Sequence, residues 1–453
     1  MSRIAIIGVG YVGLTTSAAL AYLGHQVVAA DVDQNRVELL RSGAIPIVES
    51  GLLELVTDQR HAGRLTFAPM DGHVVADAEF TFLCVPTPQA DDGSADLTYV
   101  SAAAHQIAPH LPSGSVVVNK STVPVGSVAI VGTALGRPDV SVVSNPEFLR
   151  EGRAVYDCLH PDRIVIGATD RIVARRVAAL YDGLDAPVVL TDPASAETVK
   201  YACNAFLATK VSFINEVANL CQAVGADVGD VVVGMGLDRR IGADHLKPGP
   251  GWGGSCFPKD TNALVRIAAD HGYDFALVRG AIAANEDQFS RVADRVAVAS
   301  GGDLSGVQVG VWGLSFKAGT DDLRDSPSLA VIAHLRSRGA RVVAYDPTQP
   351  SADHALLLPL DVEVVTDLYA ACVGSASLVV LTEWPEFADA DFNVVASVLG
   401  APVAAATGLR IGVVVSESDQ RPAGRPAVVD ARNLLDPAVV TTSGCHYEGI
   451  GRR

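Results

Sequence analysis

The chain has 453 residues, which is long enough for two or three domains with separate buried cores. Hydrophobic residues make up 49% of the sequence and charged residues 19%, and this composition excludes a disordered or fibrous protein. The formal net charge of −17 argues against a nucleic-acid or anionic-membrane partner, because both require clustered lysine and arginine.

The seven cysteines are scattered, with neither a Cys-x-x-Cys pair nor a His–Cys spacing typical of a metal site. We therefore expect reduced thiols, no bound metal and a cytoplasmic protein. The sequence enters a strand pattern at residues 4–7, so no signal peptide is expected.

Short apolar runs alternate with helical patterns over the first 195 residues, which predicts βαβ units and a parallel sheet. The predicted strands are Ile4–Ile7, Val27–Ala30, Phe80–Val85, Val116–Asn119, Ser141–Ser144 and Arg163–Gly167. Residues 1–195 are therefore expected to form an N-terminal α/β domain.

From about Ala194 to Val233 few helix breakers occur, and the apolar spacing predicts one long helix followed by a shorter one. Proline and glycine crowd residues 247–254, and helical patterns then run to about Ser300. We assign residues 196–300 to a central helical region.

A second alternation of strands and helices fills residues 301–453. Its predicted strands are Val307–Trp312, Arg341–Tyr345, Leu378–Thr382 and Val428–Asp430. The predicted fold is α/β, with two Rossmann-like parallel-sheet domains joined by a long central helix.

The first predicted strand is followed by Gly8-Val9-Gly10-Tyr11-Val12-Gly13 and then by a helix predicted from about Leu14 to Leu23. Glycines permit the tight turn and the close approach of a pyrophosphate, which the helix N-terminus attracts. Asp31, at the end of the second strand, can accept hydrogen bonds from ribose hydroxyls and would repel a 2′-phosphate. The pattern favours NAD over NADP; the alternative is a glycine-rich turn without a dinucleotide.

Five segments in this order resemble the UDP-glucose/GDP-mannose dehydrogenase family, and within it the UDP-glucose 6-dehydrogenases. They are Ser121–Gly126 (STVPVG), Asn145–Gly152 (NPEFLREG), the helix Lys200–Glu216, Gly253–Asp260 (GGSCFPKD) and Gly313–Lys317 (GLSFK). The resemblance covers nearly the whole chain. It implies a homodimeric enzyme that uses NAD to oxidise the C6 alcohol of UDP-glucose to UDP-glucuronate.

Oxidation of an alcohol to an acid requires two hydride transfers and a water molecule. A cysteine can capture the intermediate aldehyde as a thiohemiacetal, which is oxidised to a thioester and then hydrolysed. The resemblance assigns this role to Cys256, and Lys259 nearby would favour its thiolate. The alternative for Cys256 is a buried structural cysteine, as we expect for the other six.

Lys200 and Asn204 are four residues apart and share a helix face, where both can donate hydrogen bonds to an oxyanion. The resemblance implies that role, although a lysine on a helix is more often solvated. It makes Glu147 a candidate general base, for which we expect a pKa raised by partial burial. Thr122 and Asp260 are implied to order a water molecule, with a helix cap as the alternative for Asp260.

The resemblance also implies two larger sets of binding residues. Cofactor-binding residues would be Gly8, Gly10, Tyr11, Val12, Gly13, Asp31, Arg36, Thr87, Pro88, Ser121, Thr122, Glu151, Lys259 and Arg324. Substrate-binding residues would be Glu147, Phe148, Leu149, Lys200, Asn204, Arg240, Lys247, Gly251, Trp252, Gly253, Phe316, Lys317 and Arg432, with Arg240 reaching the neighbouring subunit's active site.

Three features depart from the family pattern: a longer segment at about 399–427, Ala431 in place of a common glycine, and Trp252 in place of a smaller aromatic residue. They bear on the base and sugar more than on the reaction. The alternatives are therefore dTDP-glucose, GDP-mannose or a UDP-N-acetylhexosamine. More distant alternatives are a β-hydroxyacid or 6-phosphogluconate type of dehydrogenase, which makes a single hydride transfer, and a non-enzymatic sensor of NADH or nucleotide sugar.

Overall fold

The computed structural model describes residues 1–90, 92–400 and 425–452. Its internal contacts divide the chain into two compact units. Unit 1 comprises Met1–Asn204 and Asn262–Asp274, and unit 2 comprises Ala205–Thr261 and Phe275–Arg453. A separate central region at 196–300 stays a prediction. Most of the long 399–427 segment lies outside the described residues.

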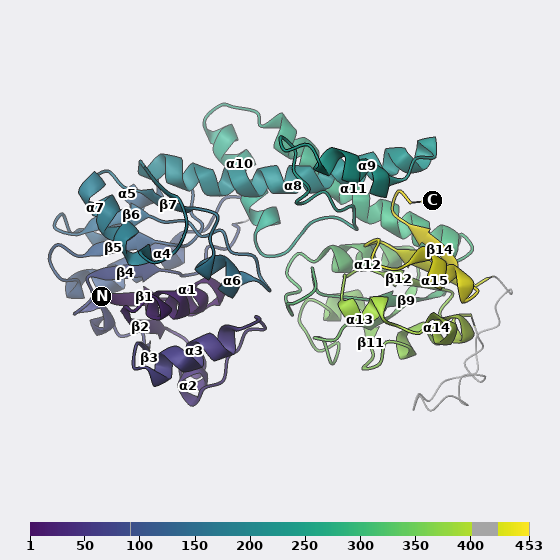
Figure 1. The fold of residues 1–453 in the computed structure, drawn as a ribbon, viewed down its shortest axis with the longest axis horizontal. Helices are drawn as coiled ribbons and strands as arrows, with labels where there is room; N and C mark the ends of the chain where they lie inside the picture. The colour runs from purple at the N-terminus through teal and green to yellow at the C-terminus, as the bar shows by residue number, and fades with distance from the viewer. Residues whose placement is uncertain (91, 401–424, 453) are drawn as a thin grey trace. The chain divides into compact units, whose positions relative to one another are not determined.

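Unit 1 is built on one sheet with helices on both faces (Figure 1). Its strands are β1 (Arg3–Ile7), β2 (Gln26–Asp31), β3 (Leu65–Pro69), β4 (Phe80–Leu83), β5 (Val116–Asn119), β6 (Ser141–Ser144), β7 (Ile164–Gly167) and β8 (Val188–Thr191). Its helices include α1 (Tyr11–Tyr22), α2 (Gln34–Ser42), α3 (Leu52–His61), α4 (Thr98–Ile107), α5 (Ser127–Leu135), α6 (Ala154–Leu159) and α7 (Arg171–Ala178).

The strand order is β3-β2-β1-β4-β5-β6-β7-β8, parallel except where β7 meets β6. The order reverses between β1 and β4, and open α/β sheets bind ligands in the crevice at such a point, beyond the carboxyl ends of the strands. This position in unit 1 is where the glycine-rich turn predicted from the sequence lies.

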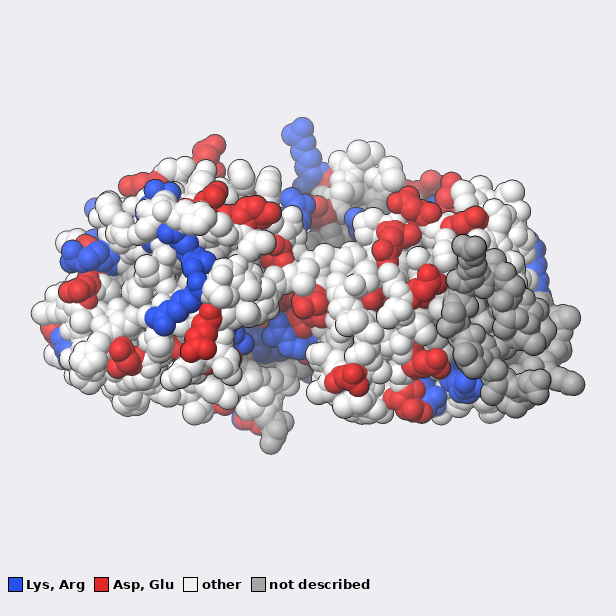
Figure 2. Space-filling view, turned by 90° about the horizontal axis from the view of Figure 1, so that it is seen from below, with Lys and Arg blue, Asp and Glu red and all other residues white. Residues whose placement is uncertain are grey.

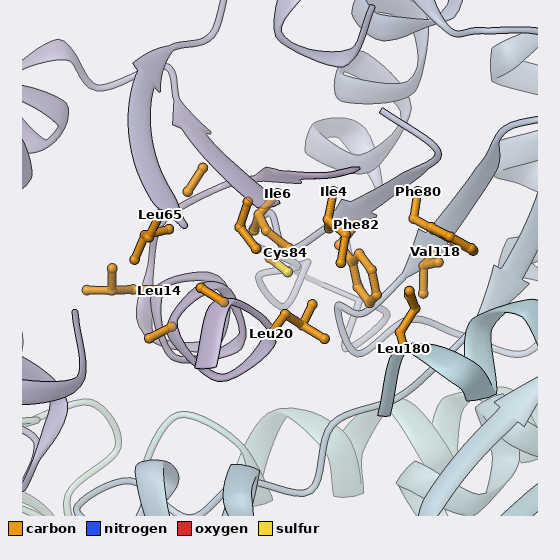
Figure 3. Close-up of a cluster of buried hydrophobic side chains, with 14 of the residues drawn as sticks. Ile4, Ile6, Leu14, Leu20, Leu65, Phe80, Phe82, Cys84, Val118 and Leu180 are labelled. Atoms are coloured by element: carbon orange, nitrogen blue, oxygen red, sulfur yellow. The ribbon is translucent and has the colours of Figure 1, made fainter. Parts of the chain in front are cut away.

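Alternate residues of β1 point to opposite faces of the sheet and enter different cores. Ile4 and Ile6 pack with Leu14 and Leu20 of α1 on one face, as Figure 3 shows. Ile7 packs on the other face with residues of α4 and α5. Burial on both faces explains why the central strands read as unbroken apolar runs in the sequence.

Unit 2 contains a second, all-parallel sheet in the order β11-β10-β9-β12-β13-β14. Its strands are β9 (Gln308–Trp312), β10 (Arg341–Tyr345), β11 (Val362–Val364), β12 (Ser377–Val380), β13 (Ala427–Asp430) and β14 (His446–Gly449). Its helices include α9 (Val228–Gly236), α11 (Ala276–Ala299), α12 (Pro327–Ser337), α13 (Pro385–Ala388), α14 (Phe392–Val398) and α15 (Pro437–Thr442).

Two helices have residues in both units: α8 (Pro193–Val224) and α10 (Phe257–Asp270). The long helix followed by a shorter one is confirmed by α8 and α9, and the two Rossmann-like sheets are confirmed as well. The predicted start of α1 at Leu14 was wrong. The helix begins at Tyr11, so Gly13 lies in its first turn.

Charged side chains are dispersed over the surface. On the face shown in Figure 2, acidic and basic side chains of the described residues are interspersed among uncharged ones. Within the described ranges, no helix is both long enough and apolar enough to span a membrane.

Candidate active site

The glycine-rich turn of unit 1 is shaped by close contacts inside the protein. Gly8 has φ +95°, and a Cβ there would lie 2.6 Å from the Cys84 carbonyl oxygen. A Cβ on Gly13 would lie 1.8 Å from the Gly8 carbonyl oxygen, so only glycine fits at position 13 in the first turn of α1. A Cβ on Gly10 would have no atom within 4 Å, so the surface above the turn is open.

Within the described part of the chain, no side chain caps the N-terminus of α1. The N-cap residue is Gly10, so no N-cap side chain satisfies the first N–H groups of this helix. Backbone N–H groups and the positive end of the helix dipole bind phosphate, so this turn fits a dinucleotide pyrophosphate.

Asp31 ends β2 beside this turn and is 7% exposed. Its carboxylate accepts hydrogen bonds from the N–H groups of Val9 (2.8 Å) and Asp33 (2.9 Å). Arg36 lies 3.5 Å from the same carboxylate. These contacts fix the carboxylate next to the turn, as ribose recognition requires.

Most of the remaining predicted residues of unit 1 follow the carboxyl ends of neighbouring strands. Thr87 and Pro88 follow β4, Ser121 and Thr122 follow β5, and the segment 147–151 follows β6. The Ser121 hydroxyl donates to the Val85 carbonyl (2.7 Å), which ties two of these loops together. The parallel sheet thus brings residues far apart in the sequence to one edge.

Glu147 and Lys200 form a buried ion pair in unit 1. Lys200 Nζ donates to Glu147 Oε1 at 2.7 Å, and the two residues are 3% and 5% exposed respectively. Asn204 is one helical turn from Lys200 on α8 and is 7% exposed. The predicted shared face of Lys200 and Asn204 is therefore an inward one, and a solvated lysine is excluded.

The pKa of Glu147 differs from the predicted direction. Burial raises it, but Lys200, the Leu149 N–H (2.6 Å) and the Lys120 charge outweigh burial and hold the pKa below its ordinary value. The expectation of a raised pKa was wrong because it considered burial without the cation that the fold places against the carboxylate. Glu147 is thus ionised at neutral pH.

Two carboxylates that sequence reasoning missed hold the site loops in place. Glu49 accepts a hydrogen bond from the Tyr11 hydroxyl, and the Gly152 N–H donates to Glu49 at 2.7 Å. Glu197 on α8 accepts from the N–H groups of Gly126 (2.6 Å) and Val128 (3.0 Å). Each carboxylate is distant in sequence from its partners, and neither has a motif that could have revealed it.

Cys256 lies in unit 2, directly before α10. Its carbonyl accepts the hydrogen bond of the Asp260 N–H (2.9 Å), and its thiol lies 3.5 Å from the Ser255 hydroxyl. Cys256 is partly exposed, whereas Cys84, Cys221, Cys372 and Cys445 are buried. A structural role by complete burial is thereby excluded for Cys256.

Asp260 is fully buried in the first turn of α10 and accepts a hydrogen bond from Lys259 Nζ at 2.6 Å. Because α10 begins at Phe257, Asp260 lies inside the helix and is not its cap. Lys259 therefore pairs with a carboxylate.

The glycines before Cys256 have a packing role. A Cβ on Gly253 would lie 1.9 Å from the Asp325 carbonyl oxygen, and one on Gly254 would lie 2.7 Å from the Phe316 ring. The Gly254 N–H also donates to the Asp325 carbonyl. The segment before the cysteine is thus held against residues 316–327 of the same unit.

Three predicted substrate-binding residues meet in unit 2. Arg432 donates to the Phe316 carbonyl (2.9 Å) and lies 3.2 Å from Glu383, and Lys317 Nζ lies 5.3 Å from the centre of the Phe316 ring. A Cβ on Gly249 would lie 3.7 Å from the Arg432 guanidinium, so the glycine-rich loop borders the same group.

Other predicted residues have different surroundings. Trp252 is 6% exposed, and its indole donates to the Ser212 hydroxyl at 2.8 Å. Lys247 is exposed, and the side chains of Arg240 and Arg324 are 89% and 61% exposed. Both arginines pair with an aspartate two residues earlier in the chain. Among the described residues, no group of three or more His, Cys, Asp or Glu is arranged to hold a metal ion.

Three family models match the chain in order. The NAD-binding domain of the UDP-glucose/GDP-mannose dehydrogenase family matches residues 2–185, its central domain 194–287 and its UDP-binding domain 310–408. The chain belongs to the UDP-glucose/GDP-mannose dehydrogenase family.

Members of this family resemble the chain over its full length. The UDP-glucose 6-dehydrogenase TuaD of Bacillus subtilis is 42% identical over 100% of this chain and 94% of its own length. The Rhizobium meliloti UDP-glucose 6-dehydrogenase is 42% identical, with 99% of each chain covered. The UDP-glucose dehydrogenase structure from Pyrobaculum islandicum is 36% identical, with a TM-score of 0.85 over 100% of this chain and 98% of that one.

Family membership defines the enzyme class: the chain is an NAD-dependent nucleotide-sugar 6-dehydrogenase. The turn at Gly8–Gly13 and the Asp31 carboxylate fit the dinucleotide. When bound, NAD supplies the hydride acceptor.

Asp31 is predicted to determine the preference for NAD over NADP. Asp31→Asn keeps an oxygen that can accept from Val9 but removes the charge that opposes a 2′-phosphate, and it leaves Arg36 to attract one. We expect the ratio of kcat/KM for NAD to that for NADP to fall at least about tenfold, because charge-assisted bonds contribute roughly 1.5–3 kcal/mol each. Asp33→Asn, which removes the same charge from an exposed neighbour, is the matched control. An unchanged ratio in Asp31→Asn would contradict this role.

Proposed function

We propose that the chain oxidises UDP-glucose to UDP-glucuronate in the cytoplasm, through a thioester on Cys256. The main support for the proposal is the buried Lys200–Glu147 pair. An alcohol oxidation that ends in hydrolysis needs a hydrogen-bond donor to the substrate's C6 oxygen and a base that accepts a proton from water. The 42% identity to UDP-glucose 6-dehydrogenases supports UDP-glucose as the substrate.

In the first oxidation, the C6 hydroxyl releases its proton to water as C6 gives up a hydride, which the NAD held in unit 1 would accept, and an aldehyde forms. Lys200 and Asn204 donate hydrogen bonds to the C6 oxygen and stabilise its developing negative charge. Their location on α8, at 3% and 7% exposure, keeps water from competing for these donors.

In the next steps, the Cys256 thiolate adds to the aldehyde carbon, and the oxygen takes up a proton to give a thiohemiacetal. Release of that proton to water and of a second hydride, which a second NAD would accept, yields the thioester. The location of Cys256 at the N-terminus of α10 supports this role, since a helix N-terminus stabilises negative charge and the thiolate is the nucleophile.

In the last step, Glu147 accepts a proton from water as the water attacks the thioester carbon, and the Cys256 thiol leaves with a proton. Glu147 is a weak base while Lys200 is bonded to it. When Lys200 donates instead to the substrate oxygen, the pKa of Glu147 rises toward the range that a general base needs. Thr122 and Asp260 are proposed to order this water.

Cys256→Ala should lower acid formation roughly 10³-fold or more, because no other group replaces the nucleophile. NAD binding and the melting temperature should be retained, and Cys256→Ser should stall at the aldehyde or at a slowly hydrolysed ester. Cys203→Ala, a change at another partly exposed cysteine, is the control. Acid formation by Cys256→Ala at a near wild-type rate would eliminate the thioester.

A substrate panel tests the sugar and the type of reaction together. UDP-glucose, dTDP-glucose, GDP-mannose and a UDP-N-acetylhexosamine are each assayed for NADH release and product mass. We expect the highest kcat/KM for UDP-glucose and two NADH for each sugar consumed. One NADH would indicate the single-hydride alternative, none a sensor, and a higher kcat/KM for another sugar would reassign the substrate.

We also propose that two chains form a dimer through α8. Phe206, Phe213, Leu220 and Val224 are 54–67% exposed and recur at intervals of seven, seven and four residues, which places them on one side of the helix. An exposed apolar stripe of this kind is typical of an interface. Two-fold symmetry would let each Arg240 contribute to the partner's substrate site.

Phe213→Asp should shift the molar mass toward that of a monomer in light scattering, because it buries a charge in the interface. Ile172→Asp changes an equally apolar, 69% exposed residue of α7 and should leave the mass unchanged. Mixed dimers of Arg240→Ala and Cys256→Ala should recover activity, since one site would then carry both native residues. Full activity of a monomer, or no recovery in verified mixed dimers, would refute the shared site.

A further inference from the structure

Lys120 is a buried lysine that follows β5 and was not singled out by the sequence motifs. It is 9% exposed, and its ammonium donates to Asn145 Oδ1 at 3.2 Å. The Tyr181 hydroxyl donates to the same oxygen, while Asn145 Nδ2 donates to the Val165 carbonyl. The hydrogen-bond partner of this buried cation is therefore a neutral amide, located two residues before Glu147.

The charges around Lys120 come from several elements. Cys84 after β4, Cys158 on α6 and Tyr181 face it, but burial raises the pKa of each thiol to about 12 and that of the tyrosine further, so all three are neutral at ordinary pH. Glu147 and Lys200 provide the charges that act on it. Burial, aided by Lys200, lowers the pKa of Lys120, and Glu147 opposes that shift.

Lys120, Glu147 and neutral Asn145, Cys158 and Tyr181 also line one cavity of about 160 Å³ in unit 1. Two further pairs of charged side chains line it. Arg150 pairs with Asp157 at 2.6 Å, and Arg163, whose guanidinium stacks 3.7 Å above the Phe148 ring, lies 4.0 Å from Asp162. His160 is exposed at its rim. Each of these arginines is therefore close to an acid of its own. The two cations that act on Glu147 are Lys200 and Lys120.

We propose that Lys120 is a positioning residue that keeps Glu147 ionised during the reaction. Glu147 has Lys200 as its direct partner, and the proposed function requires Lys200 to turn toward the substrate oxygen. A buried carboxylate that loses its partner takes up a proton unless another cation remains nearby. Lys120 provides that cation, and its bond to Asn145 keeps it out of the reaction. The inference rests on the proposed function for the role of Glu147 as a base.

The test measures the protonation of Glu147 directly. In Lys120→Met, which keeps the length of the side chain without the charge, the carboxyl of Glu147 should titrate about one pH unit higher, since removal of a nearby cation favours the neutral acid. The measurement is the carboxyl band in difference infrared spectra against pH, with Glu147→Gln to assign the band. The low-pH limb of the rate profile for product formation should move to higher pH by the same amount. At pH values below the wild-type limb, the rate should therefore fall roughly tenfold.

Two control variants separate charge from packing. Tyr181→Phe removes the other hydrogen bond to Asn145 Oδ1 without changing a charge, and should leave the titration of Glu147 in place. Lys120→Arg keeps the charge and should restore the wild-type titration. A residue that only supports the fold would lower the rate equally at every pH. Lys120→Gln is used if the Met variant does not fold.

The outcomes distinguish this inference from the proposed function. An unchanged carboxyl titration in folded Lys120→Met or Lys120→Gln overturns the inference, as does an equal shift in Tyr181→Phe. A shifted titration with an unchanged pH profile supports the action of Lys120 on Glu147 and refutes Glu147 as the base. Shifts in both measurements support the inference and the base together.

Discussion

The organisation of unit 1 depends on the buried ion pair between Lys200 and Glu147, residues that are 53 positions apart in the chain. Desolvation of two charges costs several kcal/mol for each ion, and removing one partner of such a pair costs about 3–5 kcal/mol. A hydrophobic pair would stabilise the fold as well, so stability alone gives no reason for an ion pair here. The proposed reaction needs both charges and would explain the pair, which links α8 to the turn after β6.

Parallel strand order explains why the other site residues gather near this pair. Both sheets have the order 3-2-1-4-5-6 in their first six strands, but the acid at the end of the second strand differs between them. Asp31 is 7% exposed and lies beside the turn at Gly10, where a Cβ would have no atom within 4 Å. Asp346 is 2% exposed and accepts from the N–H groups of Leu314 (2.8 Å) and Ser315 (3.0 Å). The two units therefore share one strand order but differ in their ligand sites. The loops after the strands determine whether the aspartate at the end of the second strand is accessible to a ligand.

The sequence predicts the central strands of both sheets and misses their edges. The edge strands β8 and β11 are partly exposed, whereas β1 and β9 are buried along most of their length. In β11, Glu363 interrupts a run of only three residues, so the apolar pattern of a central strand is absent. β8 has such a run at Val188–Leu190, which was not predicted as a strand. Site residues within motifs could likewise be named from the sequence. Glu49, Glu197 and Lys120 could not, because each acts on a distant segment. The pKa direction of Glu147 was wrong for the same reason, since only the fold brings Lys200 to it.

Glycine serves the same physical purpose in the two loops that carry the proposed chemistry. At the start of α1, a Cβ on Gly13 would overlap the Gly8 carbonyl, and before α10 a Cβ on Gly253 would overlap the Asp325 carbonyl. In both places the missing side chain lets one backbone segment lie directly on another, so that the N-terminus of the next helix is held at a fixed point. For α1 that helix start would hold the cofactor phosphates, and for α10 it follows directly on Cys256. The glycines thus act by fixing the position of a helix dipole, and the chemistry at each helix start follows from that position.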